Sequence, residues 1–338
     1  MANIAVLGNT TWGTTLALLA LRAGANVRIW TRSDDEARRL NAARADQRSL
    51  PSITLPDELT YFGSIKETLN GASMLIVAVP SQTVRENMAL AADHVGSSML
   101  IMSASKGLEQ GSGKRISEVI ADTVNPRYHK NICSLSGPNL SGEIVQNMPA
   151  TTVVAAADIE VATRAQQIMS SKLFRVYISE DITGVELGGA LKNIIALSAG
   201  MSDGLNYGDN AKSALITRGL AEISRLGIAM GANPFTFYGL AGLGDLVTTC
   251  ASKLSRNHHV GEHLAKGKKL DEITSSMTGI AEGITASVVA RELAHKLSVE
   301  MPITEQVYRV LYKGVSVKQA MQSLMERELR HERAGLDR

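Results

Sequence analysis

The fold is decided near the N-terminus, by the stretch Asn3-Ile4-Ala5-Val6-Leu7-Gly8-Asn9-Thr10-Thr11-Trp12-Gly13. Its first five residues are mostly apolar and predict a buried strand, and the Leu- and Ala-rich residues after Gly13 predict a helix. A glycine turn between a strand and a helix is typical of dinucleotide-binding domains, in which amides at the helix N-terminus hold a pyrophosphate. Thr10 stands where the middle glycine of that motif normally lets the backbone approach the pyrophosphate.

The alternation of short apolar runs and helical segments continues to about residue 180. Further strands are predicted at 26–31, 74–79, 99–103, 132–135 and 151–155, with an edge strand near 173–178. Helical patterns between them cover about 13–23, 34–42, 82–92, 112–123 and 158–170. Near-continuous apolar strands separated by helices indicate a parallel sheet that is covered on both faces.

After residue 180 the strand-like runs stop and only helical patterns remain. They cover 181–201, 210–230, 234–238, 257–266, 282–296, 303–312 and 316–325. We therefore predict an α/β protein of two domains. Residues 1–180 would form a Rossmann-type doubly wound sheet that binds NAD(P), and residues 181–338 an all-α domain that binds substrate and carries the catalytic group.

The composition excludes several classes of protein. The chain has 338 residues, 44% of them hydrophobic and 20% charged, which is the composition of a globular protein. A net charge of +2 gives no bulk attraction to nucleic acid or to anionic lipid. The N-terminus lacks the basic region of a signal peptide, and the apolar runs are too short to span a membrane. We expect a cytosolic protein, with Cys133 and Cys250 as buried thiols or, alternatively, joined in a single disulfide.

Cofactor preference is suggested by the end of the second strand. NAD-specific enzymes usually carry Asp or Glu about 20 residues after the glycine turn, to bind the ribose 2′-hydroxyl. Thr31 occupies that position here, and Arg32 follows it, where a guanidinium would pair with a 2′-phosphate. Asp34 and Asp35 come later and fit the first turn of a helix. This pattern favours NADP, with NAD as a second cofactor.

Two other strand ends offer contacts for a ligand, because ligands of doubly wound sheets bind at the carboxyl ends of the strands. Lys106 follows the predicted strand 99–103 and precedes a glycine. The turn Ser136-Gly137-Pro138-Asn139-Leu140-Ser141 follows strand 132–135 and would present backbone amides and small polar side chains.

The helical half contains the residues suited to acid–base chemistry. Gly188 and Gly189 are adjacent in a predicted helix, where each costs about 1 kcal/mol relative to alanine, so another backbone or a cofactor should approach closely there. Lys192 follows among apolar residues and could exchange a proton with an alcohol or a carbonyl. The glycine-rich run 239–244 predicts a tight turn that places Asp245.

A phosphate site is predicted at the start of a later helix. Ser255, Arg256 and Asn257 place a guanidinium and two hydrogen-bonding side chains at a helix N-terminus, which favours anions. His259 and His263 follow at a spacing of four, but no third ligand has a diagnostic spacing. We expect no metal site and interpret these histidines as solvated or as capping groups.

Several motifs of the helical half resemble the signatures of bacterial NAD(P)-dependent glycerol-3-phosphate dehydrogenases. They are VELGGALKNIIA (185–196), SDGL (202–205), GDNAK (208–212), LITRGLAE (215–222) and LAGLGDL (240–246). The resemblance covers essentially the whole chain and is densest from 184 to 262. It implies reversible hydride transfer between NAD(P)H and dihydroxyacetone phosphate, giving sn-glycerol 3-phosphate for glycerophospholipid synthesis.

The resemblance also implies roles for individual residues. Lys192 would be the acid–base catalyst. The substrate would be held by Lys106, Gly137, Asn139, Lys192, Asp245, Ser255, Arg256 and Asn257. NADP would be held by Thr11, Trp12, Arg32, Lys106, Ser141, Arg256, Ile280 and Glu282.

Four positions depart from the family pattern. Thr10 replaces the second glycine, and Thr11 stands where serine is usual. Asn139 replaces a usual Ser or Thr, and Ser141 a usual Ala, which puts the side-chain contacts at 139 and 141 in question.

Two other functions remain open on the sequence. One is another two-domain reductase, acting on a hydroxyacyl or ketopantoate substrate, which would not need the phosphate site at 255–257. The other is a non-catalytic NADP-binding regulator, against which the presence of Lys192 and Asp245 speaks. The apolar faces of the helical half are compatible with a homodimer.

Overall fold

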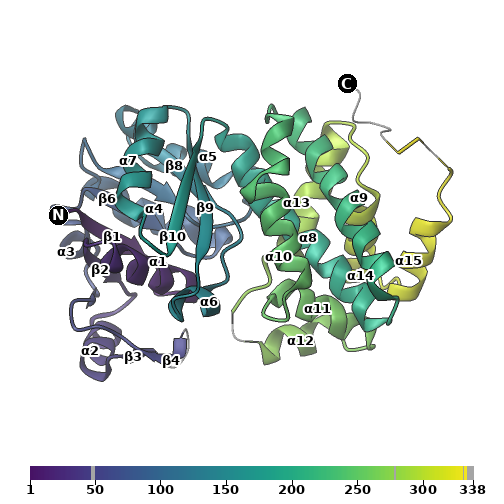
Figure 1. Cartoon of the computed structure of the whole chain (residues 1–338), viewed down its shortest axis with the longest axis horizontal. Helices are drawn as coiled ribbons and strands as arrows, with labels where there is room; N and C mark the ends of the chain where they lie inside the picture. The colour runs from purple at the N-terminus through teal and green to yellow at the C-terminus, as the bar shows by residue number, and fades with distance from the viewer. Residues whose placement is uncertain (47–49, 278, 330, 333–338) are drawn as a thin grey trace. The chain divides into compact units, whose positions relative to one another are not determined.

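The computed structural model describes residues 1–46, 50–277, 279–329 and 331–332, and the chain divides into two compact units (Figure 1). The first unit comprises Met1–Lys106 and Ile116–Ile182, and the second Gly107–Arg115 and Thr183–Arg338. The short segment Gly107–Arg115 therefore groups with the second unit, although in sequence it lies inside the first predicted domain.

The first unit contains an eight-stranded sheet in the order β10-β9-β8-β7-β6-β1-β2-β5. Its strands are β1 (Asn3–Leu7), β2 (Asn26–Trp30), β5 (Thr60–Phe62), β6 (Met74–Val77), β7 (Leu100–Ser103), β8 (Ile132–Ser136), β9 (Ala150–Ala156) and β10 (Phe174–Ser179). From its β5 edge to β8, the sheet has the strand order β5-β2-β1-β6-β7-β8, and all neighbours in this part are parallel. This is the strand order of a Rossmann-type sheet. The strand order reverses between β1 and β6, where such sheets bind their ligand.

The sheet has an apolar layer on each face, as the continuous apolar strands predict. Along β1, Ile4 and Val6 pack into one buried cluster, while Ala5 and Leu7 pack into another. The first cluster includes residues of α1 (Thr11–Arg22), α2 (Asp34–Ala43), α6 (Ser141–Val145) and α7 (Ile159–Met169). The second includes residues of α3 (Ile65–Leu69), α4 (Val84–Ala91) and α5 (Ile116–Thr123). The prediction of a doubly wound sheet is confirmed.

Two predictions about this sheet need correction. The sheet is not wholly parallel, because β9 pairs antiparallel to β8, with Cys133 opposite Ala156. Strand β5 and the small antiparallel pair β3 (Ala45–Asp46) and β4 (Leu50–Thr54) were not predicted. These strands are short, and their sequence has no long apolar run to mark them. The predicted edge position near 173–178 is confirmed, since β10 ends the sheet.

The second unit is helical. Its helices are α8 (Ile182–Gly204), α9 (Gly208–Ala229), α10 (Asp245–Ala251), α11 (Arg256–Ala265), α12 (Leu270–Ser276), α13 (Glu282–Lys296), α14 (Pro302–Tyr312) and α15 (Val317–Met325). The predicted helix at 234–238 is the 3-10 helix η4 (Pro234–Tyr238), and a π-helical turn, η5 (Leu240–Gly244), follows it. Helix α8 is buried along almost all of its length, so the other helices pack around it. Helices α10 and α12 are additional to those predicted.

The structure also tests what the sequence predicts about the two cysteines and about membrane-spanning segments. Cys133 and Cys250 are free thiols and both are buried, so the disulfide alternative is wrong. Along the part of the chain that the structure describes, no helix combines the length and apolarity needed to cross a bilayer.

Candidate active site

The glycine turn after β1 lies at the reversal of strand order, and its two glycines are required sterically. Gly8 has φ +119°, and a Cβ there would lie 2.8 Å from the carbonyl oxygen of Ala78. A Cβ on Gly13 would lie 2.2 Å from the carbonyl oxygen of Gly8, so α1 could not pack so closely with any other residue. The turn therefore has the close helix–strand approach that a dinucleotide cradle needs.

Thr10 replaces the missing middle glycine without strain. Its backbone is extended, with φ −104° and ψ 164°, so no glycine is needed there for conformational reasons. Its hydroxyl accepts a hydrogen bond from the amide of Gly13 at 3.0 Å and donates one to the carbonyl of Ala78 at 2.7 Å. Thr10 is thus the N-cap of α1 and joins that helix to the end of β6. The amides of Thr11 and Trp12 in the first turn have no carbonyl partner within the helix and fit a pyrophosphate.

The two residues that follow β2 differ in exposure, since Thr31 is buried and Arg32 is exposed. Thr31 is buried, and its hydroxyl donates to backbone carbonyls, with Ser33 O at 3.0 Å and Phe62 O at 3.3 Å. Arg32 is exposed. Ser33 caps α2 through the amide of Glu36, and Asp34 begins that helix, as predicted. Arg32 is the first side chain after β2 to face solvent, and its cationic head is accessible to an anion.

Lys106 lies just beyond β7 and is held within the first unit. Its ammonium donates to the carbonyl oxygen of Gly137 at 2.9 Å. The preceding Ser105 donates its hydroxyl to the carbonyl of Val79 at 2.6 Å. The indole of Trp12 donates to the carbonyl of Ala104 at 3.1 Å. The ends of β6, β7 and β8 and the start of α1 are therefore tied together where the sequence predicts ligand contacts.

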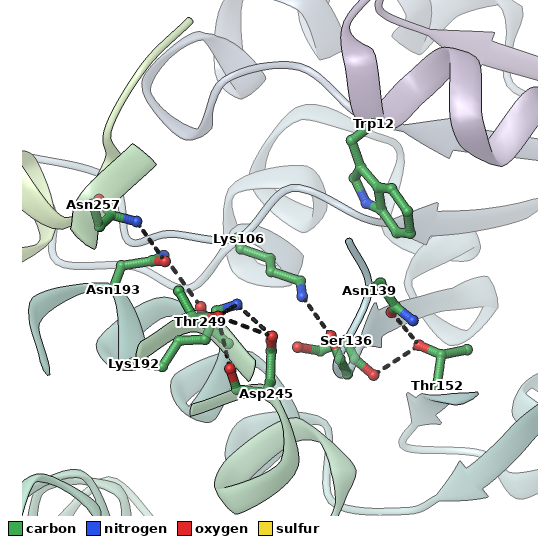
Figure 2. Close-up of polar contacts among 12 residues, drawn as sticks. Trp12, Lys106, Ser136, Asn139, Thr152, Lys192, Asn193, Asp245, Thr249 and Asn257 are labelled. Carbon is green, nitrogen blue, oxygen red and sulfur yellow. Dashed lines mark hydrogen bonds and ion pairs between the residues drawn. The ribbon is translucent and has the colours of Figure 1, made fainter. Parts of the chain in front are cut away.

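In the turn after β8, the side chain of Asn139 binds neighbouring residues of the protein. Gly137 has φ +150°, and a Cβ there would lie 3.0 Å from the Cα of Thr152. The amide of Asn139 donates to the carbonyl of Thr151 at 3.0 Å. Its Oδ1 accepts from the hydroxyl of Thr152 at 2.9 Å (Figure 2). Asn139 thus fastens the turn to β9, and a ligand contact by this side chain stays a prediction. Ser141 is half-buried and begins α6.

In the second unit, Lys192 is the centre of a buried polar cluster (Figure 2). It lies in the middle of α8, and the residue is 6% exposed. Its ammonium donates to Oδ1 of Asp245 and to the hydroxyl of Thr249 at 2.7 Å. Thr249 in turn donates to the backbone carbonyl of Asp245 at 2.7 Å. A cation taken so far from water needs a counter-ion, and Asp245 supplies it.

The glycines predicted around this cluster account for its geometry. A Cβ on Gly188 would lie 2.5 Å from the carbonyl oxygen of Ala241, so the turn η5 can approach α8 only at glycine. A Cβ on Gly242 would lie 2.1 Å from the carbonyl of Phe237, so the turn itself also needs glycine. This close contact of two backbones places Asp245, the first residue of α10, beside Lys192. The predicted tight turn and the predicted close approach at Gly188 are both confirmed.

The predicted phosphate site begins helix α11. Ser255 is the N-cap, and its hydroxyl accepts from the amide of His258 at 3.2 Å. Arg256 is the first helical residue and keeps an exposed surface, while desolvation lowers its pKa and the carboxylate of Glu282 acts in the opposite direction. A Cβ on Gly279, at φ +93°, would lie 2.3 Å from Nη1 of Arg256. The guanidinium therefore lies against the backbone of the segment that carries Ile280 and Glu282.

Asn257 links three helices from inside. Its amide donates to Oδ1 of Asn193 at 2.9 Å, and its own Oδ1 accepts from the amide of Gly283 at 2.9 Å. The side chain thus joins α11 to α8, one residue beyond Lys192, and to the start of α13. Ile280 is 50% exposed, and Glu282 begins α13 half-buried. Thr278, in the same segment, lies outside the described residues.

The prediction that the histidines of the run 257–263 are solvated or cap a helix is wrong for His258. His258 is buried, and its Nε2 lies 2.8 Å from a carboxylate oxygen of Asp203, which also binds the ammonium of Lys212 at 2.7 Å. Burial raises the pKa of Asp203, but its bonds to Lys212 and His258 outweigh this and lower it overall. The rings of His259 and His263 lie with their centroids 4.0 Å apart and are tilted by 39° to each other. Within the described residues, no three His, Cys, Asp or Glu side chains come together as a metal would need.

Sequence reasoning missed several members of the site. Thr249, which binds the ammonium of Lys192, lies in none of the quoted motifs. Asn193, which binds Asn257, lies in the motif 185–196 but had no assigned role. Arg115 forms a buried ion pair with Glu186 at 2.7 Å, over a separation of 71 residues. Such pairs carry no local signal, because only the packing of distant segments brings the two charges together.

Comparison with known proteins identifies the family. Residues 3–162 match the family model described as NAD-dependent glycerol-3-phosphate dehydrogenase N-terminus, and residues 181–322 match that of the C-terminus. The chain is 51% identical to glycerol-3-phosphate dehydrogenase (NAD(P)+) of Dehalococcoides mccartyi, with 99% of this chain and 94% of the relative covered. It is 45% identical to the enzyme of that name from Geobacillus thermodenitrificans, with coverages of 98% and 97%.

A solved structure agrees with the sequence relatives. The crystal structure of glycerol-3-phosphate dehydrogenase from Coxiella burnetii matches with a TM-score of 0.90 at 35% identity, covering 96% of this chain and 99% of that one. Both halves of the chain match the same family, and the relatives named above match over nearly their whole length. The chain therefore belongs to the family of NAD-dependent glycerol-3-phosphate dehydrogenases.

Proposed function

We propose that this chain reduces dihydroxyacetone phosphate reversibly to sn-glycerol 3-phosphate, with NADP as its preferred cofactor and NAD as a second. The observation that carries the proposal is the buried ammonium of Lys192, held between Asp245 and Thr249 in a chain of this family. Residues 1–180 would serve as the cofactor-binding domain and residues 181–338 as the substrate-binding and catalytic domain.

The proposed reaction uses Lys192 as the acid. Bound NADPH would supply the hydride for the ketone carbon of the substrate. As the ketone oxygen gains negative charge, Nζ of Lys192 stabilises it and donates a proton to it. Asp245 and Thr249 orient that ammonium through their hydrogen bonds and keep it cationic in a buried setting. In the reverse direction Lys192 takes the proton from the alcohol.

Phosphate recognition is assigned to residues around the start of α11. Arg256 offers a guanidinium beside a helix N-terminus, where amides and the helix dipole also favour an anion. Ser255 and Asn257 stand on either side of it and are buried, so they would fix the phosphate at a set distance from Lys192. Lys106, Gly137 and Asn139 complete the proposed substrate set from the ends of β7 and β8.

Cofactor binding is assigned to the turn after β1 and to Arg32. The close approach at Gly8 and the first-turn amides of α1 fit a pyrophosphate, and the exposed Arg32 fits the 2′-phosphate of NADP. The remaining proposed contacts are Thr11, Trp12, Lys106, Ser141, Arg256, Ile280 and Glu282.

We further propose that the enzyme acts in the cytoplasm as a homodimer, supplying glycerophospholipid synthesis. The support for a dimer is apolar surface on the helical unit, where Phe235 is 77% exposed and Tyr238 is 66% exposed. Sedimentation of the purified protein tests the proposed dimer, and a monomer at micromolar concentration would contradict the dimer.

The test of the activity is NADPH oxidation with a panel of carbonyl substrates, repeated with NADH. We expect turnover with dihydroxyacetone phosphate and none with ketopantoate or a 3-ketoacyl thioester. Lys192→Ala should lose turnover by at least about a hundredfold while still quenching NADPH fluorescence on binding. Turnover of another substrate alone would favour a different reductase. NADPH binding without any turnover would favour a regulator.

A further inference from the structure

The first turn of helix α11 is bonded to helix α8 at two separate points. The amide of Asn257 donates to Oδ1 of Asn193 at 2.9 Å. Nε2 of the next residue, His258, lies 2.8 Å from a carboxylate oxygen of Asp203. The two α8 residues are ten positions apart, which is about 15 Å along a helix. Two adjacent side chains of α11 therefore bind α8 at points well separated from each other.

Between these two points the backbones of the helices come into close contact. A Cβ on Gly200 of α8 would lie 2.0 Å from the carbonyl oxygen of His258. A Cβ on Gly261 of α11 would lie 2.0 Å from the carbonyl oxygen of Leu197. The glycines fix how closely the helices approach, and the two polar bonds on either side of the crossing oppose rotation of α11 about it.

The carboxylate of Asp203 is shared between His258 and the ammonium of Lys212, which lies 2.7 Å away. The side chain of His258 is 7% exposed, and those of Lys212 and Asp203 are 23% and 26% exposed. The carboxylate thus lies beside the helix turn proposed to take the phosphate, where an unbalanced negative charge would repel an anionic substrate. Lys212 balances that charge, so Asp203 can hold His258 without the repulsion.

This cluster lies close to the proposed acid–base group. Burial raises the pKa of the Cys250 thiol to about 12. Two ion pairs also act on this thiol through their charges, Lys192 with Asp245 and Lys212 with Asp203. Both pairs therefore lie within electrostatic reach of one buried residue of the helical unit.

We propose that Asp203 and His258 are positioning residues that hold the first turn of α11, and with it the proposed phosphate site, in place on α8. Lys192 is part of α8 and Arg256 is part of that first turn, so the seating of one helix on the other sets the distance between them. A misplacement of about 1 Å costs on the order of a hundredfold in rate. The inference rests on the proposed function, because that function assigns the phosphate to Arg256 and its neighbours.

Steady-state kinetics of the full-length Asp203→Ala and His258→Ala variants test the proposal. We expect KM for dihydroxyacetone phosphate to rise about tenfold and kcat to change by no more than about threefold, because the phosphate is held less well while the acid–base pair is intact. His258→Gln places an amide near the position of Nε2 and should recover part of the loss. A fall of kcat with KM unchanged would overturn the proposal.

A matched control comes from an ion pair of similar exposure in the same unit. Glu305→Gln breaks the pair of Glu305 with Arg291, which lie 2.6 Å apart with side chains 37% and 31% exposed. We expect this variant to keep the KM of wild type. An equal rise of KM in Glu305→Gln would mean that loss of any ion pair in this unit weakens substrate binding, and the proposal would be wrong.

The charge balance at Asp203 has its own test. Lys212→Met leaves the carboxylate unbalanced, so KM for dihydroxyacetone phosphate should rise several-fold, and less at high ionic strength. Adding Asp203→Asn removes the charge but keeps an oxygen for His258, so KM should return toward the wild-type value. A larger rise in the double variant would contradict the role of Lys212.

A double-mutant cycle shows whether His258 acts through the phosphate site. If it does, adding His258→Ala to Arg256→Gln should cause little further loss of kcat/KM, since the phosphate contact is already lost. Independent, multiplying losses would overturn the proposal.

Hydrogen exchange gives a readout that does not need turnover. Amides of residues 256–261 should exchange several-fold faster in Asp203→Ala than in wild type or Glu305→Gln, with residues 286–296 unchanged. Inorganic phosphate should slow exchange at 256–261 in wild type and have less effect in Asp203→Ala. Unchanged exchange in Asp203→Ala would contradict the inference. Failure of wild type to reduce dihydroxyacetone phosphate would instead contradict the proposed function, and the exchange with phosphate would still decide the inference.

Discussion

Lys192 and Asp245 lie 53 residues apart in sequence, on α8 and α10, and the ammonium of the first donates directly to the carboxylate of the second. Their side chains are 8% and 2% exposed, so the pair is almost fully removed from water. The contact depends on Gly188, because only a residue without a side chain lets the turn before Asp245 reach α8. One close backbone contact therefore brings together Lys192, the proposed acid–base group, and its counter-ion.

Removing the carboxylate should affect both chemistry and folding. In Asp245→Asn the buried ammonium loses its counter-ion, so we expect kcat to fall by at least about a hundredfold and the free energy of unfolding by roughly 3 kcal/mol. Thr249→Val removes only a hydroxyl and should lower the free energy of unfolding by about 1 kcal/mol. Denaturant unfolding and NADPH oxidation measure the two effects. A fully active Asp245→Asn enzyme would exclude Asp245 from the orientation of Lys192.

Arg32 should decide between the two cofactors. Arg32→Ala removes the cation proposed for the 2′-phosphate, so kcat/KM with NADPH should fall about tenfold to a hundredfold while the value with NADH changes little. Arg39, an exposed arginine on α2, provides the control, and Arg39→Ala should leave the ratio as in wild type. Equal losses with both cofactors would mean that Arg32 does not recognise the 2′-phosphate.

Thr10 should contribute to stability through its two hydrogen bonds. Thr10→Ala removes the cap of α1 and the link to Ala78, and we expect the free energy of unfolding to fall by about 1–2 kcal/mol. Thr10→Ser keeps the hydroxyl and should lose much less. Thermal unfolding in the absence of cofactor compares the two variants, and an equal loss for both would show that the hydroxyl is not the stabilising group.

Glu222 should give the protein a pH-dependent stability. It is 1% exposed and accepts hydrogen bonds from the amides of Ile303 at 2.6 Å and Thr304 at 3.2 Å, at the start of α14. Burial raises the pKa of Glu222 from 4.5 to about 7, although those amides and Arg225 oppose the change. Between these values the unfolded chain has lost the proton that the folded chain keeps. Stability from this group therefore falls as pH rises from about 4.5 to about 7, by on the order of 3 kcal/mol.

Glu222→Gln should remove this dependence of stability on pH, because the side-chain amide of glutamine does not titrate. The melting temperature of the variant relative to wild type should rise between pH 5 and pH 8. Any constant offset from altered hydrogen bonding does not affect this comparison. A difference independent of pH would show that Glu222 is ionised throughout this range.

The sequence alone was sufficient for the elements whose pattern is local. The glycine turn after β1, the apolar strands and the helical second half follow from periodicity and backbone freedom within short windows. The motifs around Lys192 and Asp245 likewise lie in continuous runs, so the family and the residues of its chemistry could be predicted together. The cost of Gly188 within a helix likewise indicates the close approach of another backbone, which the turn at Ala241 makes.

Tertiary structure alone decided which groups meet across long separations. The antiparallel pairing of β9, the binding of Asn139 to β9 rather than to solvent, and the pair of His258 with Asp203 have no signature in any short window. Asn257 and Arg115 likewise find Asn193 and Glu186 only after the helices have packed. The reason is that hydrophobic periodicity fixes the face that an element buries, whereas a polar partner depends on the position and rotamer of a side chain from another element. Sequence thus determined the elements and their chemistry, and packing determined the contacts that place each polar group.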